Sequence, residues 1–190
     1  MRSQSPPNRR RIQAPGGFTL IEAMVSIAIL TVLAALAVPA FRTVTERMKV
    51  STVSDEMVAA LNLTRGTAIQ NNGNVTLRKL SNAEAGLTGV CNTTQDWSCG
   101  WRVFRDTDGN GVLDAGEEVI YTFNITNRVT VMRFTNGVSM TANRWGQLTG
   151  INAVRFTLLP TDTGVTSPAV TTICLNSGGR VRVLEGHIAC

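Results

Sequence analysis

A twelve-residue stretch near the middle of the chain, DTDGNGVLDAGE at residues 106–117, has the composition of a calcium-binding loop. Oxygen-bearing side chains occupy loop positions 1, 3, 5, 9 and 12, and a glycine occupies position 6, where such a loop turns sharply. The predicted ligands are Asp106, Asp108, Asn110, Val112 through its backbone carbonyl, Asp114 and Glu117. A hard cation would relieve the mutual repulsion of the carboxylates, and calcium is the one cofactor that the sequence suggests.

The flanks of this loop support a second interpretation. Residues 101–105 and 119–123 are rich in β-branched and aromatic side chains and predict strands, whereas two helices flank the loop of an EF-hand. The segment is therefore equally consistent with a solvated acidic hairpin that holds no metal.

A second candidate site is GGRVRV at residues 178–183. On a strand, Arg180 and Arg182 share one face, and two planar guanidinium groups suit the phosphates of a nucleic acid. Arg144 and Arg155 are further candidates for this patch. Arginines on an edge strand also prevent pairing with other chains, so a solvated edge is the competing interpretation. Three tryptophans are candidates for stacking on bases, although their apolar neighbours favour core positions: Trp97, Trp101 and Trp145.

Four cysteines predict two disulfides if the domain is exported, and proximity favours Cys91 with Cys99 and Cys174 with Cys190 among the three possible pairings. Zinc is disfavoured, because there is no C-x-x-C motif and His187 is the one histidine. The sequence also shows no nucleophile with a matching base and no phosphate-binding glycine loop. We therefore do not expect an enzyme.

The element that must position these sites begins with an apolar run from Phe18 to Val38 that contains a single formal charge, Glu22. As a helix this run is about 31 Å long, which matches a bilayer core. Four arginines precede residue 12 and predict that this end stays in the cytoplasm. Without them, fourteen basic and thirteen acidic residues remain, so the net charge of +5 does not by itself indicate a nucleic-acid binder.

An ordinary secretory signal would be cleaved after the run, where Ala35-Leu36-Ala37 fits the small-residue rule. The length of the run, its early carboxylate and the amphipathic pattern beyond Pro39 argue against that. Instead, GFTLIE at residues 17–22 resembles the processing site of type IV prepilins and type II secretion pseudopilins. The resemblance implies that prepilin peptidase cleaves after Gly17 and methylates the new amino terminus at Phe18, so the apolar helix is retained.

The resemblance also assigns a role to the carboxylate. It implies that Glu22 meets the free amino terminus of a neighbouring subunit as the helices pack into a filament, which neutralises two charges that would be costly alone in an apolar setting. The alternative is a Glu22 side chain that reaches the lipid headgroups.

Beyond the run, the pattern predicts a long helix that bends at Pro39 and ends near Asn71–Asn74, followed only by short strands. Its predicted apolar stripe is Phe41, Val44, Met48, Val53, Met57, Leu61, Thr64 and Ala68. The predicted strands are residues 75–80, 101–105, 119–123, 129–134, 154–159, 170–175 and 180–184. We therefore expect an α+β fold in which a long N-terminal helix packs on antiparallel sheets.

Several internal segments narrow the resemblance to the GspH/FimT group of minor pilins and pseudopilins. They are ALNLTRGTAI at 60–69, VTL at 75–77, WRVF at 101–104 with its acidic turn, and GRVR at 179–182. The group implies a leader at 1–17, a transmembrane and filament-packing helix at 18–38, its amphipathic continuation at 39–72 and a periplasmic β-rich domain at 73–190.

The implied function is that of a single-pass inner-membrane subunit that joins a type IV pilus or a type II secretion pseudopilus, at or near its tip, and helps to start assembly. The implied partners are other pilin or pseudopilin subunits, prepilin peptidase and the inner membrane. The alternative is a minor pilin that binds DNA during natural transformation, because FimT-type pilins of transformable bacteria use a matching G-R-x-R segment, here Arg180 and Arg182.

Overall fold

The computed structural model of the chain describes residues 17–149 and 153–190. The leader before Gly17, with its four arginines, lies outside the described residues. The chain divides into two compact units, Met1–Ala40 and Phe41–Cys190.

Helix α1 runs from Leu20 to Asn71 and contributes to both units. In the first unit the apolar side chains of α1 are exposed up to residue 37. By length and composition, α1 is the one helix of the described chain that could cross a membrane. The bend expected at Pro39 falls at the division between the units and stays a prediction.

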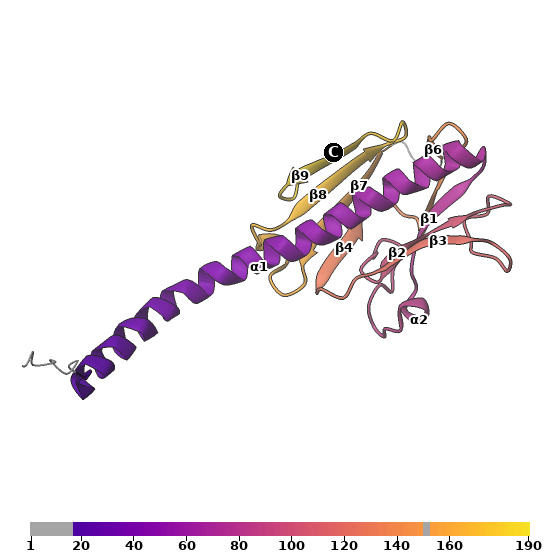
Figure 1. The fold of residues 1–190 in the computed structure, drawn as a ribbon. Coiled ribbons are helices and arrows are strands. Elements are labelled where there is room, and N and C mark those ends of the chain that lie inside the picture. The colour runs from indigo at the N-terminus through magenta and orange to yellow at the C-terminus, as the bar shows by residue number, and fades with distance from the viewer. Residues whose placement is uncertain (1–16, 150–152) are drawn as a thin grey trace, which may run out of the picture. The chain divides into compact units, whose positions relative to one another are not determined.

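In the second unit α1 lies across two sheets (Figure 1). The side chains that it buries form a stripe that recurs every three or four residues, as the helical period requires: Val50, Val53, Ser54, Met57, Ala60, Leu61, Thr64 and Ala68. The early part of the predicted stripe was wrong, because Phe41, Val44 and Met48 are 72%, 49% and 64% exposed. Close packing of the helix on the domain begins only at Val50.

The first sheet has five antiparallel strands in the order β3-β2-β1-β5-β6. Its strands are β1 (Val75–Lys79), β2 (Gly100–Arg105), β3 (Val119–Asn124), β5 (Ser139–Ala142) and β6 (Leu148–Thr149). A short helix, α2 (Asn82–Ala85), lies between β1 and β2 and begins with a capping box formed by Ser81 and Glu84.

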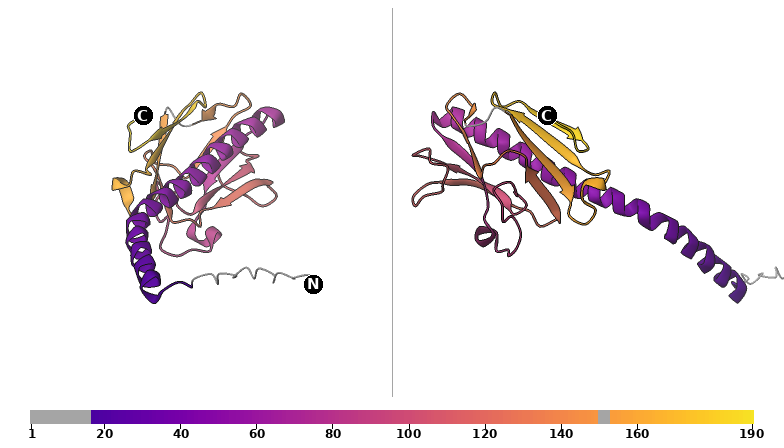
Figure 2. Two further views of the ribbon diagram at one scale, coloured as in Figure 1. Left: turned by 60° about the vertical axis from the view of Figure 1, so that its left-hand side comes forward. Right: turned by 180° about the vertical axis from the view of Figure 1, so that it is seen from behind.

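The second sheet has four antiparallel strands in the order β4-β7-β8-β9, so β9 is an edge (Figure 2). Its strands are β4 (Val129–Arg133), β7 (Ala153–Pro160), β8 (Thr171–Asn176) and β9 (Val181–Glu185), and a short 3-10 turn, η1 (Gly164–Thr166), joins β7 to β8. The α+β architecture expected from the sequence is confirmed, and each predicted strand is present with bounds shifted by one residue or so. Strands β5 and β6 and helix α2 were not predicted.

Both sheets and α1 contribute to one hydrophobic core. The indole of Trp97 meets Phe156 edge to face at 5.2 Å, and Trp101 lies 5.0 Å from Phe123. Both tryptophans are fully buried, so neither can stack on a base. Trp145 differs from them, because its side chain is 74% exposed.

Candidate functional site

The predicted processing site lies just before α1. Gly17 and Phe18 are outside the helix and exposed, and Phe18 is 87% exposed. Thr19 caps the helix: its hydroxyl accepts a hydrogen bond from the Glu22 amide at 3.3 Å, and its carbonyl accepts one from the Ala23 amide at 3.2 Å. Cleavage after Gly17 would therefore leave a free amine two residues before the first helical residue.

The Glu22 carboxylate lies in the first turn of α1, where a negative charge is favoured by the helix dipole. It is exposed, and it forms no ion pair within the described parts of the chain.

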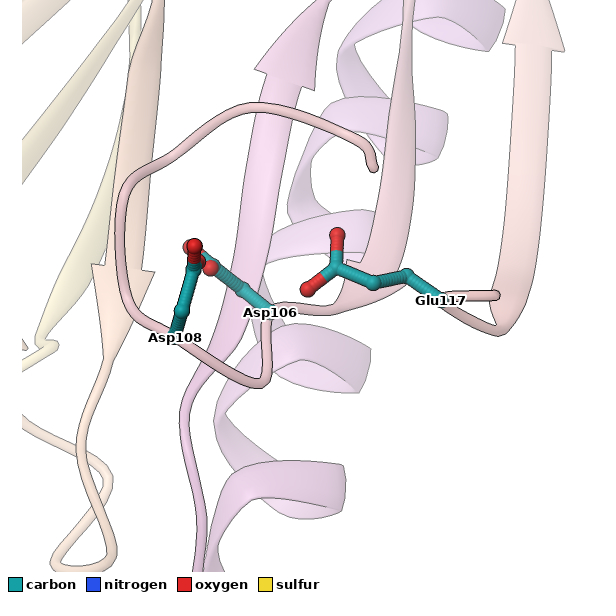
Figure 3. Close-up of side chains that lie close together, drawn as sticks. All are labelled: Asp106, Asp108 and Glu117. Carbon is teal, nitrogen blue, oxygen red and sulfur yellow. The ribbon is translucent and has the colours of Figure 1, made fainter. Parts of the chain in front are cut away.

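The acidic loop, residues 106–117, joins β2 to β3 and brings three of its carboxylates together (Figure 3). One ligand oxygen each from Asp106, Asp108 and Glu117 lies within 4.8 Å of the others. Asp106 is fully buried, whereas Asp108 is exposed. These are loop positions 1, 3 and 12 of the predicted calcium site, so the fold gathers the residues that a hard cation would need.

The same loop also satisfies its carboxylates with its own donors. Asp106 accepts hydrogen bonds from the Thr76 hydroxyl at 2.6 Å and from the amides of Gly109 and Gly111 at 2.8 and 2.9 Å. Glu117 accepts bonds from the amides of Thr107 and Asp114, at 2.7 and 3.0 Å.

The remaining predicted ligands lie at the loop tip. The Asn110 side-chain nitrogen donates to the carboxylates of Asp108 and Asp114, each at 2.8 Å, and the Asn110 side-chain oxygen accepts a bond from the Val112 backbone amide. The residues fit a calcium ion, but the hydrogen bonds within the loop also stabilise its conformation without one.

The arginines of the second candidate site lie at the edge of the second sheet. Arg180 precedes β9, Arg182 is paired with Cys174 of β8, and both side chains are exposed. Within the described residues neither arginine forms an ion pair, and Asp162 pairs instead with Arg128 at 3.5 Å.

The Arg155 side chain, unlike those of Arg180 and Arg182, is held by contacts within the chain. Its guanidinium lies 3.6 Å from the centre of the Phe134 ring and donates to the carbonyl of Ile188 at 3.3 Å. Packing on an aromatic face and on the C-terminal segment accounts for this side chain without a ligand.

Arg65 has a role that was not predicted from the sequence. From α1, its guanidinium donates to the carbonyls of Gly146 at 2.8 Å, Gly179 at 2.6 Å and Gly178 at 3.2 Å. The helix thereby holds the β5–β6 turn and the β8–β9 turn together. A lone arginine next to the buried stripe of a helix was the signal that could have indicated such a role.

Two disulfides, Cys91–Cys99 and Cys174–Cys190, fasten loops of the domain, and they are the pairs favoured by proximity in sequence. Beside the first, the Lys79 ammonium donates to the carbonyls of Cys91, Thr93 and Asp96 at 2.9, 2.5 and 2.6 Å. Burial lowers the pKa of Lys79, and the nearby Asp96 only partly opposes that effect. Lys79 thus organises the first disulfide loop.

The other shifted groups also have structural causes. The hydrogen bond from Tyr121 to Glu56, at 2.5 Å, raises the pKa of Tyr121 to about 12, and partial burial adds to it. Burial lowers the pKa of Arg133 to about 10, while its guanidinium holds the carbonyls of Gly137 and Ser139.

The Glu84 carboxyl combines opposing effects. Burial alone would raise its pKa, but hydrogen bonds from Ser81 and the charges of Arg102 and Arg78 outweigh burial, so the pKa is lowered. The ion pair with Arg102, at 3.0 Å, joins α2 to β2.

Comparisons with known proteins agree with this architecture. A family model described as "Type II transport protein GspH" matches residues 53–185, and one described as "Prokaryotic N-terminal methylation motif" matches residues 14–38. No curated protein matches the chain significantly in sequence.

Solved structures with a similar fold include the type IV minor pilin FimU of Pseudomonas aeruginosa, with 16% identity and a TM-score of 0.54 over 73% of this chain and 90% of that one. The minor pseudopilin EpsH of the Vibrio cholerae type 2 secretion system is also similar, with 10% identity and a TM-score of 0.49 over 72% of this chain and 97% of that one.

Proposed function

Because the chain belongs to the GspH family and is a minor pilin or pseudopilin of the GspH/FimT kind, we propose that it works at or near the tip of its filament, where it helps assembly to begin. The filament is a type IV pilus or a type II secretion pseudopilus. The observation that supports incorporation into the filament is the start of α1, where an exposed apolar helix bears one carboxylate, Glu22, four residues after Phe18. The position at the tip and the role in starting assembly rest on membership of the family.

The proposed sequence of events follows from that arrangement. Prepilin peptidase cleaves after Gly17 and methylates the amine of Phe18, the apolar part of α1 holds the subunit in the inner membrane, and the β-rich domain lies in the periplasm. On assembly, the apolar helices pack side by side and leave the lipid. Glu22 then meets the amine of a neighbouring Phe18, and the two charges compensate each other where neither would be stable alone.

The test is to express the full chain with Glu22→Ala in its native host and to compare its amount in sheared filaments with its amount in membranes. We expect cleavage and membrane level to stay normal and the filament fraction to fall at least tenfold. Asp55→Ala is a matched control, because Asp55 is an exposed carboxylate of α1 outside the apolar run. Normal recovery of the Glu22 variant in filaments would contradict the proposal.

A second candidate function is binding of DNA at Arg180 and Arg182, and their exposure without an ion pair supports it. Two arginines alone would give a weak interaction with a salt slope of about −1.8. Binding of duplex DNA at two salt concentrations, compared with the Arg180→Ala, Arg182→Ala double variant, tests this function. Binding that is insensitive to salt or to the double substitution would contradict it.

We also propose calcium as a stabilising ion of the acidic loop, and the convergence of Asp106, Asp108 and Glu117 supports it. Bound calcium would supply positive charge among the carboxylates and take no part in filament packing. The melting temperature in calcium should exceed that in magnesium, since ligands that bind only the folded state raise its stability. An equal shift with both ions would count against a specific site.

A further inference from the structure

Two turns lie side by side next to the C-terminal end of α1. One joins β5 to β6 at residues 143–147, and the other joins β8 to β9 at residues 177–180. Arg65 donates to carbonyls of both, and the Leu148 amide donates to the Ser177 carbonyl at 3.1 Å. We name these two turns and Arg65 the turn platform.

The glycines of the turn platform make room for the molecule's own helix. Gly179 has φ +81°, and a Cβ there would lie 2.1 Å from Cζ of Arg65. Gly146 has φ +72°, and a Cβ there would lie 2.8 Å from Cδ1 of Ile69. Any other residue at these positions would be strained and would displace these side chains. The glycines thus allow both turns to pack closely against α1 in one conformation.

The turn platform presents the one exposed indole of the described chain. Trp145 is 74% exposed, whereas Trp97 and Trp101 are 0% exposed. The Asn143 side chain fixes the backbone around Trp145, because it accepts hydrogen bonds from the amides of Trp145 and Gln147, each at 3.0 Å. A rigid, exposed aromatic ring can bind a ligand at low cost in conformational entropy.

The turn platform also carries two arginines. Arg144 precedes Trp145 in the chain, Arg180 follows the glycine that Arg65 holds, and both arginines are exposed. Neither turn contains an acidic residue, as NRWGQ at 143–147 and SGGR at 177–180 show. The platform thus combines a flat apolar ring with two cations, which suits a ligand that has both an aromatic face and negative charge.

We propose that Trp145 stacks on an unpaired base of single-stranded DNA while Arg144 and Arg180 contact the adjacent phosphates. This inference rests on the second candidate function, and it narrows the ligand from duplex to single strand. In a duplex the base faces are covered by their neighbours, so an indole can reach them only in an unpaired strand. An acidic protein would satisfy the arginines but would offer no set of regularly spaced aromatic faces.

The experiment uses the full chain in detergent micelles, a thymidine oligonucleotide, a duplex of the same length, and polyglutamate as an anion without bases. Fluorescence anisotropy of a labelled oligonucleotide measures affinity in the parent and in each variant, and quenching of tryptophan emission in the parent reports on the exposed indole, since the other two tryptophans are buried. We expect the oligonucleotide to quench the exposed indole, and Trp145→Ala to weaken binding roughly tenfold or more. Trp145→Phe keeps an aromatic face and should lose only a few-fold.

The variants distinguish DNA binding at Arg180 and Arg182 from base stacking at Trp145. If Trp145→Ala binds the oligonucleotide as well as the parent does, while the Arg180→Ala, Arg182→Ala variant does not, DNA binding stands and the stacking role is overturned. If the parent binds neither form of DNA, both are overturned. Preference for the duplex, or equal binding of polyglutamate, would also overturn the single-strand assignment. Thermal unfolding of each variant confirms that the fold persists.

Discussion

Replacing Asp106 by alanine tests whether the acidic loop is held by hydrogen bonds or by a cation. The buried carboxylate accepts three bonds, from the Thr76 hydroxyl and from the amides of Gly109 and Gly111. After Asp106→Ala, Thr76 keeps its bond to the Thr141 hydroxyl at 2.6 Å, but the two amides lose their acceptor. The Gly111 amide is buried, whereas the bond of the Gly109 amide is partly exposed. At about 1 to 3 kcal/mol for an unsatisfied buried donor and less for an exposed one, we expect a loss of roughly 3 kcal/mol.

In a domain of this size such a loss lowers the melting temperature by roughly 6–12 °C. The assay is thermal unfolding followed by circular dichroism in the presence of a chelator, so that no divalent cation contributes. Asp108→Ala is the matched control: its side chain is exposed and should cost less than about 1 kcal/mol. Equal melting of the two variants in chelator would refute the argument. A difference that emerges only when calcium is added would assign the stabilisation to the ion.

Two further predictions concern contacts that join separate elements. Tyr121 is the chain's single tyrosine and its pKa is raised to about 12, so its bond to Glu56 stabilises the fold below pH 10 and is lost as the pH rises through 12. Glu56→Ala should move the phenolate absorbance midpoint toward about 10, and an unchanged midpoint would contradict this contact. Replacing Cys174 and Cys190 by serine should cost about 2–4 kcal/mol and expose residues 186–190 to carboxypeptidase, whereas unchanged protease resistance would show that packing alone holds that segment.

The strands that the sequence predicted are those with an apolar, β-branched signal of their own. Strands β5 and β6 lack it, because SMTA and LT are short and carry polar residues. They are strands because β1 provides a partner, with Val75 opposite Ala142, and β6 then pairs with β5. Pairing between segments more than sixty residues apart is a tertiary effect that local pattern does not contain.

Helix α1 also shows what local sequence pattern cannot predict. Val44 and Met48 have the spacing and chemistry of Val53 and Met57, yet the first two are exposed and the last two are buried. Periodicity shows which face of a helix is apolar, but it does not show what covers that face. In the first unit and the early part of the second, the apolar surface of α1 is free for contact with lipid or with other subunits, as the proposed filament requires.

The candidate sites differed in how far residue type could predict them. The calcium template placed Asp106 in the acidic loop, but its burial depends on Thr76, thirty residues earlier. The glycine pair before Arg180 is approached closely by Arg65 of the same chain, which lies more than a hundred residues earlier and is not indicated by the local sequence. Once such internal partners are assigned, the groups left without one in the described chain are the stronger candidates for external contacts. Glu22 at the start of α1 and Trp145 near its other end are of this kind, which is why the proposals for filament packing and for base stacking rest on them.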